Sequence, residues 1–209
     1  MASASPTVGG ASPAISAAIF QQDRFIARQK VFTFAPQFFF LDQNGNTLAY
    51  LRKKVFTWKD EIRIFTDPGQ TMELLSIKAR KIIDWGTAFD VTDSINHQKV
   101  GALKRRGWKS LVRKEWTIMD ANDQEIGKVQ EDSLFLATVR RYLINIIPQS
   151  YSFEIGGQSV GTAKQNWNLF APKMEVDFTD DPGKRLDRRL VAAAIVLLMA
   201  VEGRQSAYD

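Results

Sequence analysis

The sequence predicts a mainly β protein with a central α-helix: about twelve antiparallel strands form a barrel that encloses an apolar helix near the C-terminus. Two observations favour this fold class. From Phe25 to Phe178, short segments alternate apolar and polar residues, which is typical of antiparallel strands with one buried and one wet face. The segment 190–201, LVAAAIVLLMAV, is apolar all round, and such a helix is either buried on every side or in a membrane.

The composition suits one folded domain and excludes several kinds of site. Of the 209 residues, 44% are hydrophobic, enough for a core over 21–203, between a flexible Ala-, Ser-, Pro- and Gly-containing tail at 1–20 and a short tail at 204–209. The absence of cysteine excludes thiolate metal sites and a cysteine nucleophile. His97, the single histidine, lies in a polar turn and is expected to be exposed. Without a nucleophile–base pair, we expect no enzyme activity and no cofactor.

The strands are defined by their alternation and by the turns between them. Met174, Val176 and Phe178 share one face of a strand, while Glu175 and Asp177 share the other. The tightest turns are predicted at residues that favour them, namely Gly45, Pro68-Gly69, Asn122-Asp123 and Gly156-Gly157.

Four segments repeat one pattern, in which an alternating strand and a polar turn precede a returning strand that opens with a small residue. These predicted β-hairpins begin at Phe38, Phe89, Trp116 and Tyr151. Their returning strands contain the pairs Leu48-Ala49, Val100-Gly101, Ile126-Gly127 and Val160-Gly161. The glycines predict a bend or a close approach of backbone. A fifth hairpin, 62–77, is predicted to turn at 67–70.

Two segments depart from the strand pattern. Apolar residues at helical spacing predict an amphipathic helix over 133–147, which Pro148 ends. The second helix is predicted from Arg185 to Val201, and its all-apolar part spans about 18 Å, short of a bilayer core of about 30 Å. We therefore expect no transmembrane span and a helix that fills the barrel.

The order of these elements resembles the tubby-like superfamily, and within it the LURP-one-related and phospholipid scramblase-like branch. The hairpins with Gly101, Gly127 and Gly161, the stretch 131–155 and the ending 174–203 carry the resemblance, which covers about 25–203. The resemblance implies a twelve-stranded barrel around a central C-terminal helix. It also implies a kinship with lipid-associated proteins, some of which bind phosphoinositides.

Scramblases of this superfamily carry a proposed calcium segment before the final helix. Here Asp177, Asp180 and Asp181 lie in that region and are the calcium candidates. Their spacing fits no EF-hand loop, and helix capping explains acidic residues before a helix start equally well. We therefore expect no metal site.

The basic residues are the candidate binding residues. The net charge of +5 favours anionic partners. The segment 104–114, KRRGWKSLVRK, is predicted to join two strands and contains Lys104, Arg105, Arg106, Trp108, Lys109, Arg113 and Lys114. Cations attract lipid headgroups and tryptophan favours the membrane interface. The alternative is a solvated hairpin whose tryptophan packs on its own barrel.

A second basic set consists of Arg52 and Lys54 on one strand and Lys78 and Arg80 on another. If those two strands pair, the four cations line one patch that suits a phosphate group. The alternative is ordinary outward charge that keeps strands soluble.

These patterns predict a non-enzymatic module, in the cytoplasm and peripheral at the membrane, that docks on anionic phospholipid or phosphoinositide surfaces. The second hypothesis is a protein-interaction or regulatory scaffold without lipid binding. Nucleic acid is disfavoured as a partner because 23 acidic residues are interspersed among 28 basic ones.

Overall fold

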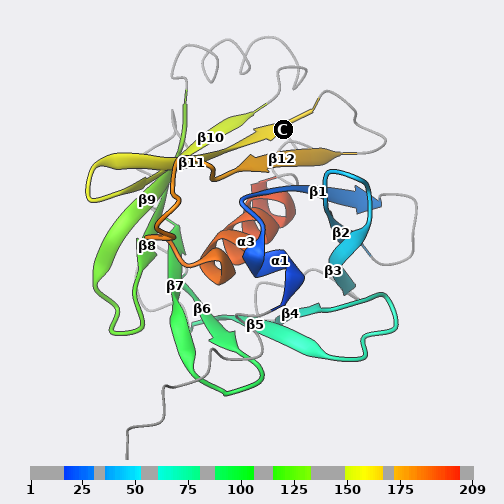
Figure 1. Cartoon of the computed structure of the whole chain (residues 1–209). Coiled ribbons are helices and arrows are strands. Elements are labelled where there is room, and N and C mark those ends of the chain that lie inside the picture. The colour runs from blue at the N-terminus through cyan, green and yellow to red at the C-terminus, as the bar shows by residue number, and fades with distance from the viewer. Residues whose placement is uncertain are drawn as a thin grey trace, which may run out of the picture.

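The computed structural model describes residues 17–30, 36–52, 61–80, 88–105, 115–132, 149–166 and 172–202. The strands in this part of the chain are all antiparallel and follow one another around a closed twelve-stranded barrel, with β1 and β12 paired to close it (Figure 1). The predicted fold class is confirmed. The strands are β1 (Arg24–Lys30), β2 (Gln37–Leu41), β3 (Thr47–Arg52), β4 (Ile62–Phe65), β5 (Glu73–Ala79), β6 (Ala88–Asp93), β7 (Lys99–Arg105), β8 (Glu115–Met119), β9 (Glu125–Glu131), β10 (Ser150–Ile155), β11 (Gln158–Gln165) and β12 (Lys173–Asp177).

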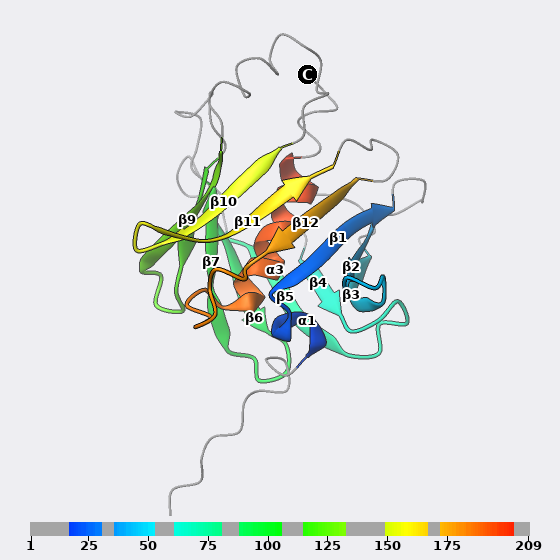
Figure 2. The ribbon, with the colours of Figure 1, turned by 45° about the horizontal axis from the view of Figure 1, so that its top comes forward.

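The apolar C-terminal helix lies inside this barrel. Helix α3 (Arg188–Leu197) continues as the π-helical turn η2 (Leu198–Glu202), and Figure 2 shows α3 along the inside of the strands. It begins at residue 188, three residues later than predicted, because the Asp187 carboxylate caps it by accepting a hydrogen bond of 2.8 Å from the backbone N–H of Arg189. No helix in the described part of the chain is long and apolar enough to cross a membrane.

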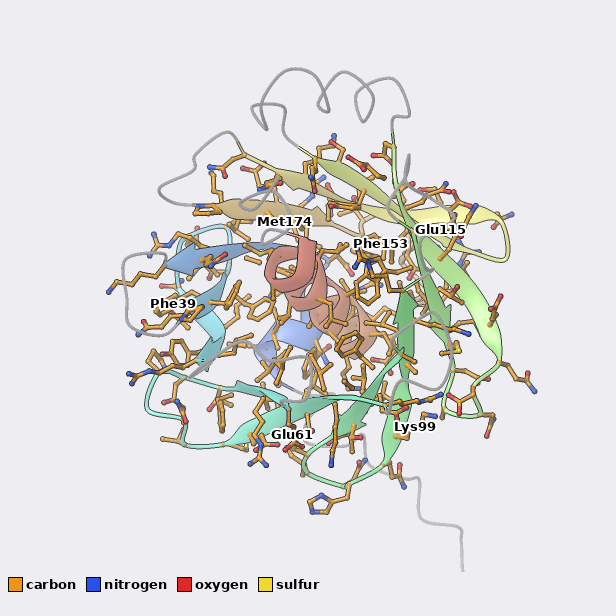
Figure 3. All side chains as sticks on the ribbon, turned by 180° about the vertical axis from the view of Figure 1, so that it is seen from behind. Phe39, Glu61, Lys99, Glu115, Phe153 and Met174 are labelled. Atoms are coloured by element: carbon orange, nitrogen blue, oxygen red, sulfur yellow. The ribbon has the colours of Figure 1, made fainter. Side chains whose placement is uncertain are left out.

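One core joins the helix to the inward faces of the strands. Val191, Ala192, Ala193 and Ile195 are completely buried, since strands surround the helix on every side. In Figure 3 the labelled Phe153 of β10 and Met174 of β12 come from neighbouring parts of the barrel wall, with β11 between their strands, and both belong to this core. The small alanine side chains let the strands approach, and the larger side chains fill the remaining space.

The internal repeat corresponds to a repeated β-bulge. In each described hairpin, the pairing register shifts by one residue early in the returning strand, and the extra residue is Leu48, Leu74, Val100, Ile126 or Val160. The residue after the bulge then pairs with the first strand, and in three hairpins it is a glycine: Gly101, Gly127 or Gly161. The predicted bend is therefore confirmed, and the hairpin 62–77 carries it as well.

The glycines also sit where another part of the chain comes close. A Cβ at Gly161 would lie 2.5 Å from the Phe178 ring, and one at Gly101 would meet the backbone carbonyl of Met119. The predicted close approach is therefore confirmed.

The predicted turns are confirmed as well. Gly45 and Asp123 adopt positive φ angles of 87° and 63°, and Asp42 and Asp120 accept hydrogen bonds from backbone N–H groups two and four residues further on. His97 is exposed in the β6–β7 turn, as expected.

The short helix α1 (Ala18–Gln21) lies at the start of the described chain. Its Ile19 and Phe20 side chains are buried in the main core, although the sequence analysis assigns both residues to the tail. The packed part of the chain thus includes residues before the predicted domain start at 21. The amphipathic helix predicted over 133–147 lies outside the described residues, as does most of the predicted tail.

We predict that Gly161→Ala destabilises the protein by about 1–3 kcal/mol, because the new methyl group must displace the Phe178 ring in a packed core. Gly183→Ala is the matched control, since a Cβ there has no neighbour within 4 Å. Chemical denaturation of both variants measures the difference. Equal stability of the two variants would contradict the close packing of β11 against Phe178.

Candidate binding surface at one end of the barrel

The barrel has two unlike ends. At one, which we call the turn end, lie α1, the start of α3 and the tight connections 42–46, 66–72, 94–98, 120–124 and 156–157. At the opposite end the odd-numbered strands finish and the even-numbered strands begin. The connections between those strand ends are outside the described residues.

The predicted basic residues that the structure describes lie at the opposite end. Arg52, Lys78 and Lys104 are exposed at the ends of β3, β5 and β7, and Arg105 is the last residue of β7. The other predicted residues lie outside the described part of the chain: Lys54, Arg106, Trp108, Lys109, Arg113 and Lys114.

The hairpin repeat explains why these cations recur at one level. In each returning strand, the residue directly after the bulge points into the core. The residue three positions further on points outward, near the end of the strand, because successive side chains alternate between the two faces of the sheet. This position holds Arg52, Lys78, Lys104 and Lys164 in four hairpins and Gln130 in β9. Arg28 supplies a further exposed cation near the same end of β1.

Arg28, Arg52, Lys78, Lys104 and Lys164 form what we call the cationic rim. All five side chains are exposed, and none makes an ion pair with a described residue. Arg28 and Lys164 were missed by the sequence analysis because neither lies in a run of basic residues. Alignment of the repeats on their small residues contains the signal for Lys164, since Lys104 and Lys164 each follow a glycine by three residues.

The strands that carry Arg52 and Lys78 do not pair, so the condition for a single patch of four cations is not met. Strand β4 lies between β3 and β5: Tyr50 of β3 pairs with Phe65, and Ile62 of β4 pairs with Ile77 of β5. The other edge of β5 is already occupied by β6, so no edge remains for β3. Arg52 and Lys78 therefore lie along the rim rather than side by side.

Arg80 is neutralised within the protein. Its guanidinium contacts Asp90 at 2.6 Å and also Asp123, and Lys99 lies 2.6 Å from Asp123. Burial raises the pKa of Asp90, but Arg80 and Lys99 outweigh it and keep that pKa below its ordinary value. Because each charge of this group already has a partner, Arg80 does not belong to the cationic rim.

The turn end contains buried ion pairs at the start of α3. Arg188 and Asp181 are almost fully buried and lie 3.0 Å apart, and Arg188 also contacts Asp23 at 2.8 Å. Arg189 reaches the buried Asp93 at 2.9 Å. Burial acts to raise the pKa of Asp181, but hydrogen bonds from the backbone N–H of Leu186 and from Arg188 lower it overall. These pairs fix the helix to the turns around it.

Two of the three calcium candidates, Asp177 and Asp181, already have partners within the protein. Asp181 accepts hydrogen bonds from Arg188 and two backbone N–H groups, and Asp177 contacts Arg24 at 2.9 Å and Thr179 at 2.7 Å. Asp180 is exposed. Among the residues that the structure describes, no group of three or more histidine or acidic side chains is placed to hold a metal ion.

The outer wall of β1–β4 carries aromatic residues that the sequence analysis did not single out. Along one row of paired residues, Arg28 lies opposite Phe39, Phe39 opposite Tyr50, and Tyr50 opposite Phe65. The Phe39 and Tyr50 rings pack edge to face with centroids 5.1 Å apart. Phe38 and Phe40 point into the core, so strict alternation contained the signal for an outward Phe39.

Comparison with known proteins gives a likeness among solved structures. No family model and no curated protein matches the chain. The X-ray structure of a protein from Arabidopsis thaliana is similar over 86% of this chain and 91% of that chain, with a TM-score of 0.49 and 12% sequence identity.

We predict that Asp181→Asn lowers stability at neutral pH by about 3 kcal/mol, because Arg188 loses its buried counter-charge. The pKa of Asp181 is depressed below 3.8, so its contribution is present above that pH and is lost as the pH falls through the folded-state pKa. The variant should therefore lose less stability than the wild type between neutral pH and about pH 3.

Chemical denaturation across this pH range measures the effect. Asp180→Asn is the matched control, because it makes the same change at the neighbouring, exposed residue and should follow the wild-type curve. Parallel curves for wild type and Asp181→Asn would contradict the charge pairing at the helix start.

Proposed function

We propose that this protein is a non-enzymatic module that binds anionic phospholipid surfaces through the cationic rim. The single observation behind this proposal is that Arg28, Arg52, Lys78, Lys104 and Lys164 are exposed near one end of the barrel without an ion pair to a described residue. A hydrogen bond from Ser76 and, more weakly, the charge of Lys78 help to lower the pKa of Glu61, but Lys78 and Glu61 do not form a contact ion pair. The charges of the five cations therefore remain available to a partner.

The distribution of charge over the two ends supports an extended anionic surface as the partner. Carboxylates are frequent in the turn-end connections, which contain Asp42, Asp67, Asp120 and Asp123. An anionic membrane attracts cations within about a Debye length and repels carboxylates. The protein would therefore approach with the cationic rim foremost.

The resemblance to the tubby-like superfamily supports the same partner class, because that superfamily includes lipid-associated and phosphoinositide-binding proteins. Its LURP-one-related and scramblase-like branch remains part of this proposal. The wide spacing of the rim cations on separate strands favours a surface of many headgroups over one small anion. We place the protein in the cytoplasm, peripheral at the membrane.

A protein partner is the second candidate function. The half-buried Phe39 and Phe65 beside the exposed Arg28 favour it, since aromatic residues and arginine are enriched at protein interfaces, whereas Tyr50 between the two rings is buried. An acidic protein surface would then meet the rim, and binding to lipid vesicles would be absent.

We predict that the triple variant Arg52→Gln, Lys78→Gln, Lys104→Gln weakens binding to anionic vesicles on the order of a hundredfold at low salt. Each cation near an anionic surface contributes about 1 kcal/mol, and three such losses multiply. Co-sedimentation with vesicles of phosphatidylcholine, with and without phosphatidylserine, measures the affinity. Vesicles of equal charge that contain a phosphoinositide show whether one headgroup is preferred.

The control removes three cations from the turn end. Arg24→Gln, Lys184→Gln, Arg185→Gln has the same net charge as the first variant, and all three of its positions are exposed. It should bind much as the wild type does. Equal weakening by both variants would attribute binding to net charge alone, and an absence of wild-type binding would favour the protein partner.

A further inference from the structure

The two sides of the cationic rim differ in charge and in polarity. Strands β3 and β9 are six strands apart in the closed order of twelve, so they face in opposite directions. In Figure 3, the labelled Phe39 of β2 and Glu115 of β8 lie on opposite sides of the central helix. An end-on approach brings both sides of the rim to a flat surface equally, whereas a tilted approach brings one side closer than the other.

The β1–β4 side combines unpaired cations with aromatic rings. Arg28 lies opposite Phe39 on the neighbouring strand, and Gln37 lies opposite Arg52. Phe39 is half-buried and packs on Tyr50, so part of its ring remains open to the outside next to the two arginines. Cations beside a half-buried aromatic ring suit a headgroup layer over hydrocarbon.

The β8–β10 side is polar, and its one described rim-facing lysine is paired within the protein. Lys128 of β9 lies 3.2 Å from Glu154 of β10, and Gln130 donates a hydrogen bond to the same carboxylate. Gln130 also occupies the repeat position that holds a cation in the other four hairpins. Asp132, one residue past β9, is exposed and carries the charge that an anionic surface repels.

We propose that the barrel docks asymmetrically on an anionic lipid surface, with the β1–β4 side of the rim against the headgroups and the β8–β10 side turned away. This orientation rests on the proposed function. The arginines Arg28 and Arg52 would contact phosphates, while the Phe39 ring would enter the boundary between headgroups and acyl chains. Turning β8–β10 away keeps Asp132 and Glu154 farther from the anionic surface.

The aromatic contribution is separable from the charge contribution. We predict that Phe39→Ser weakens binding to phosphatidylserine vesicles several-fold at physiological salt, where apolar contact is not screened. Met72→Ser, at the exposed methionine of the turn end, should leave binding unchanged. Phe39→Leu, which keeps an apolar side chain beside Tyr50, should restore most of the loss. Loss in Phe39→Ser without recovery in Phe39→Leu would overturn the role given to this position.

The orientation is measured with single cysteine labels, which the chain permits because it has no native cysteine. Gln37→Cys and Gln130→Cys place a fluorophore on opposite sides of the barrel, in strands β2 and β9, near the same end. Phosphatidylserine vesicles with a nitroxide quencher on the headgroup report the distance to the surface. We expect quenching at least twofold stronger for the label at 37 than for the label at 130.

The outcomes separate the two proposals. If neither labelled protein co-sediments with the vesicles while both remain folded, the proposed function fails and the orientation fails with it. If both co-sediment but are quenched equally, or if the label at 130 is quenched more strongly, the asymmetric orientation alone is overturned.

Discussion

Burial of the apolar helix is the constraint on which the rest of this structure depends. From Leu190 on, helix α3 has no polar face, so strands must surround it completely, and the closed barrel does so. The inward residues of every strand are then committed to the core, and only the outward residues are free to carry function. The one highly polar part of the helix, its start at Arg188 and Arg189, is held by buried carboxylates from the turn end. The barrel interior is thus filled by the protein's own side chains.

The position of the candidate surface follows from this arrangement. Each described hairpin has a bulge near its turn, and the residues after the bulge alternate in a fixed phase between core and outside. A cation placed three residues after the residue that follows the bulge points outward, at the end of its strand that is far from the turn. The same local rule, repeated along the chain, therefore gathers residues that are distant in sequence at one end of the barrel. No single sequence run accounts for the cationic rim.

The sequence analysis succeeded where local patterns decide the structure. Alternation identified the strands, turn residues such as Gly45 and Asp123 identified the hairpins, and the length of the apolar segment identified a buried helix. It failed where partners are distant in the sequence. Arg80 was counted as a binding residue, yet it contacts Asp123, 43 residues away, across the outer wall. Arg28 and Lys164 were overlooked because isolated cations give no signal until the strand register is known, and the runs 52–54 and 104–106 drew attention instead.

The central claim, that the cationic rim is the contact surface, is tested most directly on the wild-type protein by lysine acetylation read by mass spectrometry. The reaction is run with and without phosphatidylserine vesicles. The account predicts that vesicles slow acetylation of Lys78 and Lys104, whereas Lys184 at the turn end reacts at the same rate. Equal protection of all three lysines, or protection of Lys184 alone, would contradict it.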